Sequence, residues 1–210
     1  AFMNVEMQMK LKEEIARAVI VGDGRDFSAE DKINEQNIRP IISDNEFFTV
    51  HKTFADAAAF IEVVIKTMGE YRGSGMPDLY IDPILLADVK LLKDSTGKFL
   101  FGDIPSNIAI AARLGVNSIV PTSFMDGHGA LIVNLRDYTL GAVRGGEITN
   151  FDDFDIDFNQ YKYLAETRLS GALTMPKSAI HLLQGATAGK AATDAEGGMT
   201  YGTRQADKTV

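Results

Sequence analysis

The sequence has no cysteine and only three histidines, His51, His128 and His181, among its 210 residues. Without cysteine, disulfides, zinc–thiolate sites and thiol nucleophiles are excluded. Three histidines also leave little from which to build an imidazole-rich metal site. We therefore expect no bound cofactor, and the two histidines beside predicted strands, His51 and His181, are interpreted as packing residues.

Long apolar runs and an excess of basic residues are absent as well. No stretch approaches the roughly 18–20 apolar residues that span a bilayer, and residues 1–20 lack the pattern of a signal peptide. We expect a protein of a reducing compartment with no membrane partner. The 21 basic and 29 acidic residues give a net charge of −8 and a pI near 4.9. A nucleic-acid binder that relies on a basic face does not fit this balance.

What is present is the pattern of a mixed fold with a sizeable core. Hydrophobic residues make up 45% of the chain, and a chain of this length hides roughly 70% of its unfolded surface. Apolar spacing predicts helices over 1–21, 57–68, 83–92 and 106–114. Short apolar runs predict strands in IRPII (38–42), FFTV (47–50), 79–81, 116–121, 130–135 and 178–183.

Local signals set several of the predicted boundaries. Thr53 with Asp56 resembles a capping box, and Asp82-Pro83 places an N-cap before a proline at the first helical position. Gly115 is expected to close the helix that begins near Ser106.

The second half of the chain is rich in strand patterns and ends in a different composition. Residues 140–157 alternate polar and apolar. Residues 161–174 do so too, with Lys162, Glu166 and Arg168 as outward candidates, and Gly171 with the β-rich composition favours one long strand over the alternative of a helix. Residues 184–210 contain no Leu, Ile or Phe, so this low-complexity tail cannot bury enough surface to fold by itself.

Asp152, Asp153, Asp155 and Asp157 form the most conspicuous acidic cluster. On a strand, Asp153, Asp155 and Asp157 share one face, and converging carboxylates are the ligands that calcium and magnesium prefer. The glycine of a calcium-binding EF-hand loop is missing, however. A solvated acidic face, or one that meets a basic patch on another copy, is the alternative to a metal site.

The loop 122–129 contains Ser123, Asp126 and His128, the residue types of a catalytic triad. A triad also needs a group that orients the base and donors for an oxyanion, and three residues this close in one loop rarely supply that geometry. VGDGRD (21–26) lacks the third glycine of a dinucleotide-binding loop and follows a helix. The residues therefore point to a protein that is not an enzyme, with a small metal-dependent hydrolase as the alternative.

Four segments in order carry a family resemblance. They are KEEIARAVIVGDGR (12–25), LLKDSTGKFLFG (91–102), LGVNSIVPT (114–122) and AETRLSGALTMPKSAIHLL (165–183). The first resembles the end of a spine helix with its glycine-rich stop, and the last resembles a closing strand pair. Together they resemble the major capsid proteins of tailed phages, whose shell fold is shared with encapsulins.

The resemblance implies an α+β capsid fold with two subdomains. Residues 51–144 would form an axial domain, and residues 1–50 with 145–183 a peripheral domain that includes the end of the spine helix, 1–21. It implies a structural subunit without cofactor that self-assembles into pentamers and hexamers of an icosahedral head. An encapsulin-like compartment shell is the alternative. The expected place is the virion, after assembly in the host cytoplasm, with portal or scaffold proteins and loosely held packaged DNA as further partners.

Two details of the resemblance concern residues that this sequence has or lacks. The family's N-terminal arm, extended loop and most of its spine helix have no counterpart here, so we expect the 210 residues to be a piece of a larger subunit. Some members join subunits by a Lys–Asn isopeptide bond that a buried glutamate promotes. Asn159 and Glu166 match the acceptor and the promoting acid, while the donor lysine belongs to the extended loop.

Overall fold

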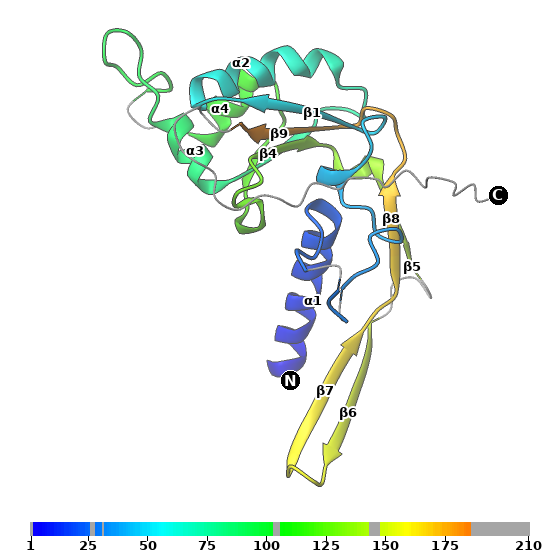
Figure 1. The fold of residues 1–210 in the computed structure, drawn as a ribbon. Helices are drawn as coiled ribbons and strands as arrows, with labels where there is room; N and C mark the ends of the chain where they lie inside the picture. The colour runs from blue at the N-terminus through cyan, green and yellow to red at the C-terminus, as the bar shows by residue number, and fades with distance from the viewer. Residues whose placement is uncertain (1, 26–27, 31, 103–105, 143–147, 186–210) are drawn as a thin grey trace, which may run out of the picture.

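The computed structural model describes residues 2–25, 28–30, 32–102, 106–142 and 148–185, with side chains from residue 5. The predicted tail lies outside the described residues, apart from its first two positions. Figure 1 shows a helix-covered sheet, the N-terminal helix α1 below it, and a long two-stranded hairpin that extends away from the sheet. Among the described helices, none combines the length and the apolar character needed to cross a bilayer.

Helix α1 (Phe2–Ile20) confirms the first predicted helix. Its end is set by Gly22, whose φ of 98° is unfavourable for residues with a side chain. The amides of Val21 and Gly22 both donate to the carbonyl of Arg17, at 2.8 and 3.0 Å. These bonds satisfy the last turn and direct the chain into the loop that follows.

A five-stranded sheet forms the centre of the fold, in the order β1-β9-β4-β2-β3. Its strands are β1 (Thr49–Phe54), β2 (Asp78–Ile81), β3 (Ile119–Pro121), β4 (Ala130–Val133) and β9 (Ala179–Gln184). The β1–β9 and β2–β3 pairs are parallel, and β4 is antiparallel to both β2 and β9. The last described strand therefore lies inside a sheet built mostly from residues 49–133, and it crosses the predicted division at residue 144.

Helices α2 (Ala57–Thr67), α3 (Pro83–Lys90) and α4 (Asn107–Leu114) pack on one face of this sheet. The predicted starts of α3 and α4 are confirmed: the side chain of Asp82 accepts from the amide of Ile84, and that of Ser106 from the amide of Ala109. Gly115 ends α4 in the left-handed conformation, as expected.

The sheet separates two hydrophobic cores because alternate residues of a strand face opposite sides. Ile180 and Leu182 of β9 pack with the helices in the first core. Ala179 of β9 and Leu131 of β4 face the other side and belong to the second core. That second core is completed by residues from α1, the segment after it, the loop after β3, the end of β4 and the ribbon described next: Ala18, Val19, Ile20, Ile38, Ile41, Ile42, Met125, Val133, Tyr138 and Leu173.

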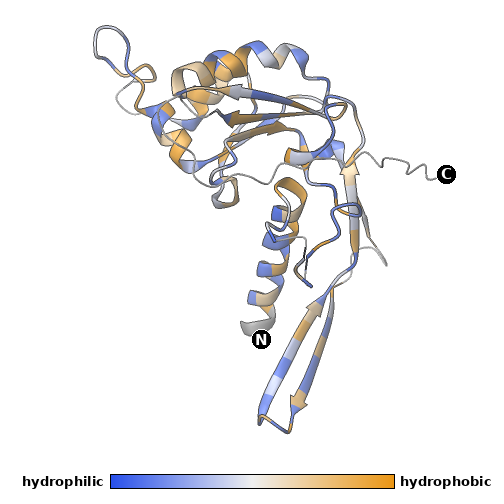
Figure 2. Cartoon of the chain, viewed as in Figure 1, coloured by the Kyte–Doolittle hydropathy of each residue, from blue (hydrophilic) through white to orange (hydrophobic). Residues whose placement is uncertain are grey.

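Four more strands lie outside the main sheet. β5 (Tyr138–Ala142) and β8 (Leu169–Leu173) form an antiparallel ribbon, and β6 (Thr149–Asp155) and β7 (Gln160–Glu166) form the long hairpin. In Figure 2 the central sheet is mainly apolar, whereas the hairpin mixes polar and apolar residues along its length. Short 3-10 turns complete the fold: η1 (Ile41–Ser43), η2 (Met68–Glu70), η3 (Ser123–Met125) and η4 (Leu135–Asp137).

Three local predictions were wrong. Thr53 is not a cap, because it stays in β1 opposite Leu183, and Asp56 itself caps α2 by accepting from the amide of Ala59 at 2.8 Å. The segment 38–42 is not a strand but a single bridge at Ile38 followed by the turn η1. The predicted strand over 161–174 is two strands, β7 and β8, with different partners.

Candidate functional site

The β6–β7 hairpin is uncovered on both faces. None of its fourteen strand residues is buried, twelve of them are exposed, and the large side chains share this exposure. The exposed large apolar residues are Phe151 (50%), Phe154 (41%), Ile156 (83%), Phe158 (73%), Tyr161 (65%), Tyr163 (43%) and Leu164 (55%). An isolated two-stranded hairpin is at best marginally stable in water, and exposed apolar clusters of this kind mark interaction sites.

One face of the hairpin is aromatic. Phe154 lies opposite Tyr161 in the register, with their ring centroids 5.0 Å apart, and Tyr161 stacks on Tyr163 at 6.4 Å. The aromatic rings contact one another along the strands and leave their outer surfaces open. Aromatic residues of this kind are favoured at protein interfaces, because each covers a large area at a low entropy cost.

The opposite face is divided into an apolar base and a charged middle. Near the base, Phe151 lies opposite Leu164, and a small hollow of about 120 Å³ separates this part of the hairpin from Met7 of α1. Further out, Lys162 forms an ion pair with Asp155, which is the only side-chain ion pair within the described hairpin. The hairpin carries five acidic residues and one basic residue, so its unpaired charge is negative.

The predicted metal candidates are not gathered at one point. Asp153 and Asp155 share a face of β6, as expected, but β6 ends at Asp155 and Asp157 lies in the turn. The carboxylate of Asp155 is paired with Lys162. Within the described ranges, no group of three or more histidine, aspartate or glutamate side chains is arranged to hold a metal ion.

The two cross-link candidates lie at opposite ends of β7. Asn159 is in the turn with a positive φ of 49°, and Glu166 pairs with Thr149 at the base. At roughly 3.3 Å per strand residue, the two are about 20 Å apart. Within one copy they cannot both reach the same bond.

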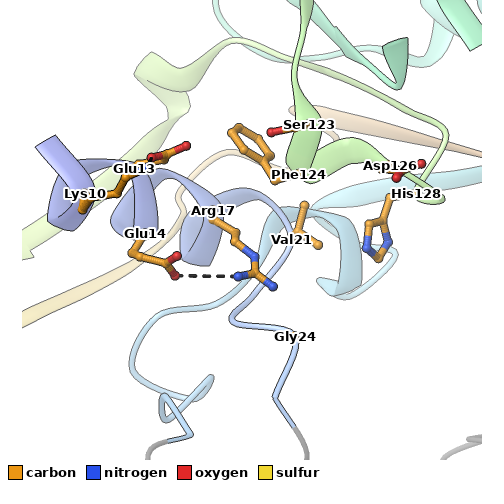
Figure 3. Close-up of a pocket in the computed structure, with 10 residues that line it drawn as sticks. All are labelled: Lys10, Glu13, Glu14, Arg17, Val21, Gly24, Ser123, Phe124, Asp126 and His128. Atoms are coloured by element: carbon orange, nitrogen blue, oxygen red, sulfur yellow. Dashed lines mark hydrogen bonds and ion pairs between the residues drawn. The ribbon is translucent and has the colours of Figure 1, made fainter. Parts of the chain in front are cut away.

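A cleft of about 470 Å³ lies between α1 and the loop that carries Ser123, Asp126 and His128 (Figure 3). The other walls come from α1 and the residues after it: Lys10, Glu13, Glu14, Arg17, Val21 and Gly24, with Phe124 from the loop. In the described part of the chain no hydrogen bond joins the side chains of Ser123, Asp126 and His128. The charged groups of the cleft are largely paired with each other, as in Lys10–Glu13 at 2.8 Å and Arg17–Glu14 at 3.8 Å.

A second exposed apolar surface lies on the helices at the far side of the sheet. Ile84 of α3 is 65% exposed and Ile108 of α4 is 82% exposed, with Leu91 at 63%. The sequence predicted these helices but did not show which apolar residues remain outside the core. The missed signal is an apolar residue in the first turn, since Ile84 and Ile108 are each the second residue after the N-cap.

The comparisons with known proteins agree with this architecture. The family model described as "Phage capsid family" matches residues 1–185, and no curated protein matches the chain. The capsid of the native GTA particle is 16% identical, with a TM-score of 0.62 over 88% of this chain and 65% of that one. The capsid of the empty GTA particle is 16% identical, with a TM-score of 0.60 over 88% and 66%.

The structure of Gordonia phage Cozz is 17% identical, with a TM-score of 0.60 over 88% of this chain and 63% of that one. The chain thus spans just under two thirds of the length of these structures. At such identities the likeness is one of fold, and it confirms the predicted α+β capsid fold. The hydrolase alternative receives no support from any of these matches. Because the family model covers all but the last 25 residues, the chain belongs to the phage capsid family.

Proposed function

We propose that this chain is the shell-forming part of a major capsid subunit that self-assembles into the icosahedral head of a tailed phage. The observation that carries the proposal is the uncovered hairpin with its aromatic face of Phe154, Tyr161 and Tyr163. Phe154 and Tyr161 stay 41% and 65% exposed in the single copy, and a neighbouring copy is the partner that a shell supplies. Family membership and fold are those of capsid proteins, and they support a structural role in the capsid of a virion.

A closed shell needs more than one contact surface on each subunit. The hairpin provides one, and the exposed Ile84, Leu91 and Ile108 on the helical side provide a second. These two surfaces belong to different parts of the fold, since the hairpin extends away from the helix-covered sheet (Figure 1). Contacts through both would propagate in two directions, as a shell requires.

We also propose that the subunit is divided into two parts. We propose that residues 51–144, together with β9, form the axial part around the first core. Residues 1–50 and 145–178 would form the peripheral part, which carries α1 and the hairpin. In this arrangement β9 belongs with the axial part, because it is hydrogen-bonded to both β1 and β4.

Partners beyond the shell itself follow from the proposed role. We infer assembly in the host cytoplasm, with portal or scaffold proteins acting on the same subunit. Packaged DNA would touch the inner wall, and the net charge of −8 favours a surface that tolerates DNA without holding it. The compartment-shell alternative shares the fold, but the family model and the compared structures with the higher TM-scores are those of phage and GTA capsids.

The isopeptide cross-link is also a proposal, and the geometry of the hairpin limits which copies could supply its residues. A lysine amine would attack the amide carbon of Asn159, the new C–N bond would form, and ammonia would leave. Glu166 would take one proton from the lysine ammonium, and a second proton of the same nitrogen would pass to the leaving amide nitrogen, which departs as ammonia. Because Asn159 and Glu166 are about 20 Å apart along β7, the two would have to come from different copies.

The test is electron microscopy and sedimentation of the natural gene product with the double substitution Phe154→Ser and Tyr161→Ser. Both side chains are exposed, so the folded subunit should keep its melting temperature while particle formation is lost. Lys66→Gln on α2, also exposed, is the matched control and should assemble normally. Particles of normal size and yield from the double variant would contradict the proposal.

A further inference from the structure

All three histidines of the chain come together on one side of the sheet. His51 of β1 and His181 of β9 are partners in the parallel register, with ring centroids 5.7 Å apart and ring planes at 89°. Nε2 of His181 lies 3.0 Å from the backbone carbonyl of His128. Residues from three distant parts of the sequence thus form one cluster, which we call the histidine cluster.

The hydrogen bonds define which ring nitrogens can take another proton. A carbonyl only accepts, so Nε2 of His181 must donate to the His128 carbonyl, and Nε2 of His51 must donate to the carbonyl of Asp44 at 3.0 Å. Nδ1 is therefore the site of protonation on both rings. Protonation costs neither hydrogen bond, and its effect is the charge that it introduces.

The histidine cluster lies on the side of the sheet where α1 packs. His181 faces the same side as Ala179, in the second core, because the two are two residues apart on β9. The side chain of His128 lines the cleft together with Arg17 of α1 and Val21, the residue directly after α1 (Figure 3). The cluster therefore touches the loop 123–128, and that loop faces α1.

The charges around the cluster do not neutralise a protonated ring at its centre. Arg17 of α1 is a cation that faces His128, and it forms an ion pair with Glu14. From the loop, Asp126 is the acidic group that faces His128. On the neighbouring strand β4 the register partner of His181 is Leu131, which carries no charge.

The remaining charged neighbours of the cluster form ion pairs. Beside His51, Oδ1 of Asp44 is paired with Arg39, while Oδ2 of Asp44 is buried without a hydrogen-bond partner among the described residues. At the open side of the cleft, Lys10 pairs with Glu13.

Burial and nearby cationic groups both favour the neutral rings of His181 and His128. Burial lowers the pKa of His181, the nearby His51 and His128 lower it further, and the hydrogen bond to the His128 carbonyl opposes them. Burial also lowers the pKa of His128, as does Arg17, while Asp126 acts in the opposite direction. As the pH falls, these histidines are therefore protonated more readily in the unfolded chain than in the folded protein, so acid destabilises the folded state.

We propose that the histidine cluster is an acid-responsive contact that holds the loop 123–128 and the end of α1 on the sheet when its rings are neutral and releases them when more than one ring is protonated. The first core lies on the opposite face and includes none of the three histidines. The helices α2 to α4 therefore stay on the sheet while the α1 side loosens. The inference concerns a conformational property of the subunit and does not depend on shell assembly.

The test uses the whole chain with its histidines replaced by glutamine, which is uncharged and keeps a donor amide. Because the chain has only three histidines, the triple variant removes every imidazole that titrates. Hydrogen exchange, corrected for the intrinsic rate, is measured between pH 7.5 and 5.5. In the wild type, residues 15–21 and 123–128 should lose protection by pH 5.5, by up to about tenfold for each histidine whose pKa is lowered. The strand β2 should keep its protection.

The triple variant should show no such loss over the same range. His51→Gln is a milder variant, since this side chain is exposed, and NMR titration of it should show the pKa of His181 rising once its neighbour is uncharged. Equal loss of protection in the wild type and in the triple variant would overturn the proposal. An unchanged pKa of His181 in His51→Gln would also overturn it. This second measurement tests the proposal even if the triple variant fails to fold.

Discussion

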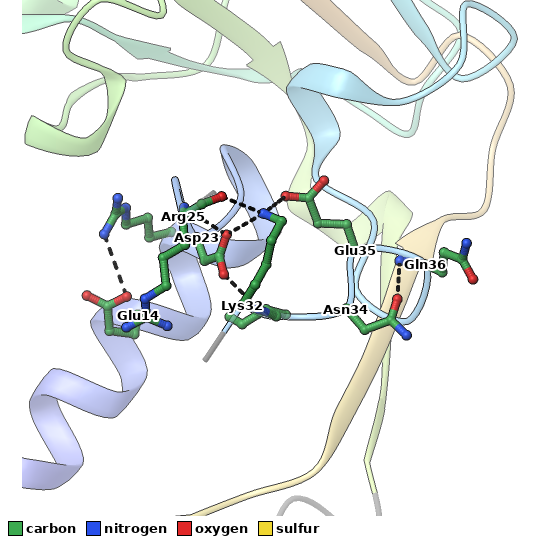
Figure 4. A network of polar contacts seen from close by, with 9 residues as sticks. Glu14, Asp23, Arg25, Lys32, Asn34, Glu35 and Gln36 are labelled. Carbon is green, nitrogen blue, oxygen red and sulfur yellow. Dashed lines mark hydrogen bonds and ion pairs between the residues drawn. The ribbon is translucent and has the colours of Figure 1, made fainter. Parts of the chain in front are cut away.

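Lys32 and Asp23 form a nearly buried ion pair that closes the loop after α1. The ammonium of Lys32 lies 2.9 Å from Oδ1 of Asp23, and the two side chains are only 11% and 1% exposed. Oδ2 of Asp23 accepts from the amide of Ile33 at 2.7 Å, and Oδ1 accepts from the amide of Arg25 at 3.2 Å. Glu35 is the second acid bound to Lys32 (Figure 4). The carboxylate of Asp23 thus binds Arg25 at the start of the loop and Lys32 and Ile33 at its end.

Replacing Asp23 by Asn should reduce stability in a pH-dependent way. Burial by itself raises the pKa of Asp23, but the hydrogen bonds from Ile33, Lys32 and Arg25 outweigh it and lower the pKa from 3.8 to about 2. A lowered pKa in the folded state means stability that is present above about pH 4 and is lost as the pH falls toward 2. After allowance for solvent screening, the substitution should cost about 1–2 kcal/mol at pH 7.

Urea unfolding of the wild type and Asp23→Asn at pH 7 and pH 2.5 measures this difference. The gap between the two proteins should narrow at the lower pH. Asp88→Asn on the exposed side of α3 serves as the control and should change little at either pH. A gap for Asp23→Asn that is the same at both pH values would show that the charge of Asp23 does not stabilise the fold.

Gly129→Ala should be far more damaging than Gly127→Ala. Both glycines have a φ of 73°, so both substitutions carry the backbone strain of a left-handed residue, about 1–2 kcal/mol. A methyl group at Gly127 meets nothing within 4 Å, whereas one at Gly129 would collide with the backbone carbonyl of Leu182 in β9. Thermal melts of the two variants side by side should show the larger loss for Gly129→Ala, and equal losses would contradict the close approach to β9.

Ile132→Ala should destabilise the subunit strongly, while Ile108→Ala should not. Ile132 of β4 is fully buried in the first core, so its truncation should cost about 2–5 kcal/mol. Ile108 of α4 is 82% exposed, and a surface change of this kind usually stays within about 0.5 kcal/mol. Denaturant unfolding measures both. A large loss for Ile108→Ala in the separate subunit would place that side chain in the core and remove it from the second contact surface.

Asn159→Asp should abolish covalent multimers of the natural particle if the proposed isopeptide bond forms. Aspartate tolerates the positive φ of this turn position, but its carboxylate has no ammonia to release. A denaturing gel of wild-type particles is expected to show bands heavier than the monomer, and the variant only the monomer. Gln160→Asn, in the next position, should keep the heavier bands. Wild-type particles that give only monomer bands would end the cross-link proposal.

Several elements could be predicted from the chain because their signals are local. The start of α3 depends on Asp82 and Pro83, and the end of α4 depends on Gly115, which adopts the left-handed conformation. Side-chain caps and glycine conformations act within about four residues, so they do not depend on which distant segments pack nearby. The resemblance to phage capsid proteins depended in the same way on short segments in a fixed order.

Other predictions were wrong where a distant partner decided the outcome. Thr53 has the residue type and spacing of a cap, but pairing of β1 with β9 keeps it in the strand, and Asp56 takes the role. Residues 161–174 have a continuous strand pattern, but β7 pairs with β6 while β8 pairs with β5. Neither partner can be identified from the alternation of the strand itself.

The sequence by itself determined the class of the protein: no thiol chemistry, few imidazoles, an acidic net charge and the helix and strand signals of a capsid subunit. Only the tertiary structure decided which residues face outward and which come together. Phe154 and Tyr161 look like core residues until the hairpin is seen to lie uncovered, and His51 and His181 look unrelated until β9 pairs with β1. The physical reason is that composition and local signals belong to single segments, whereas exposure and clustering depend on contacts between segments far apart in the chain.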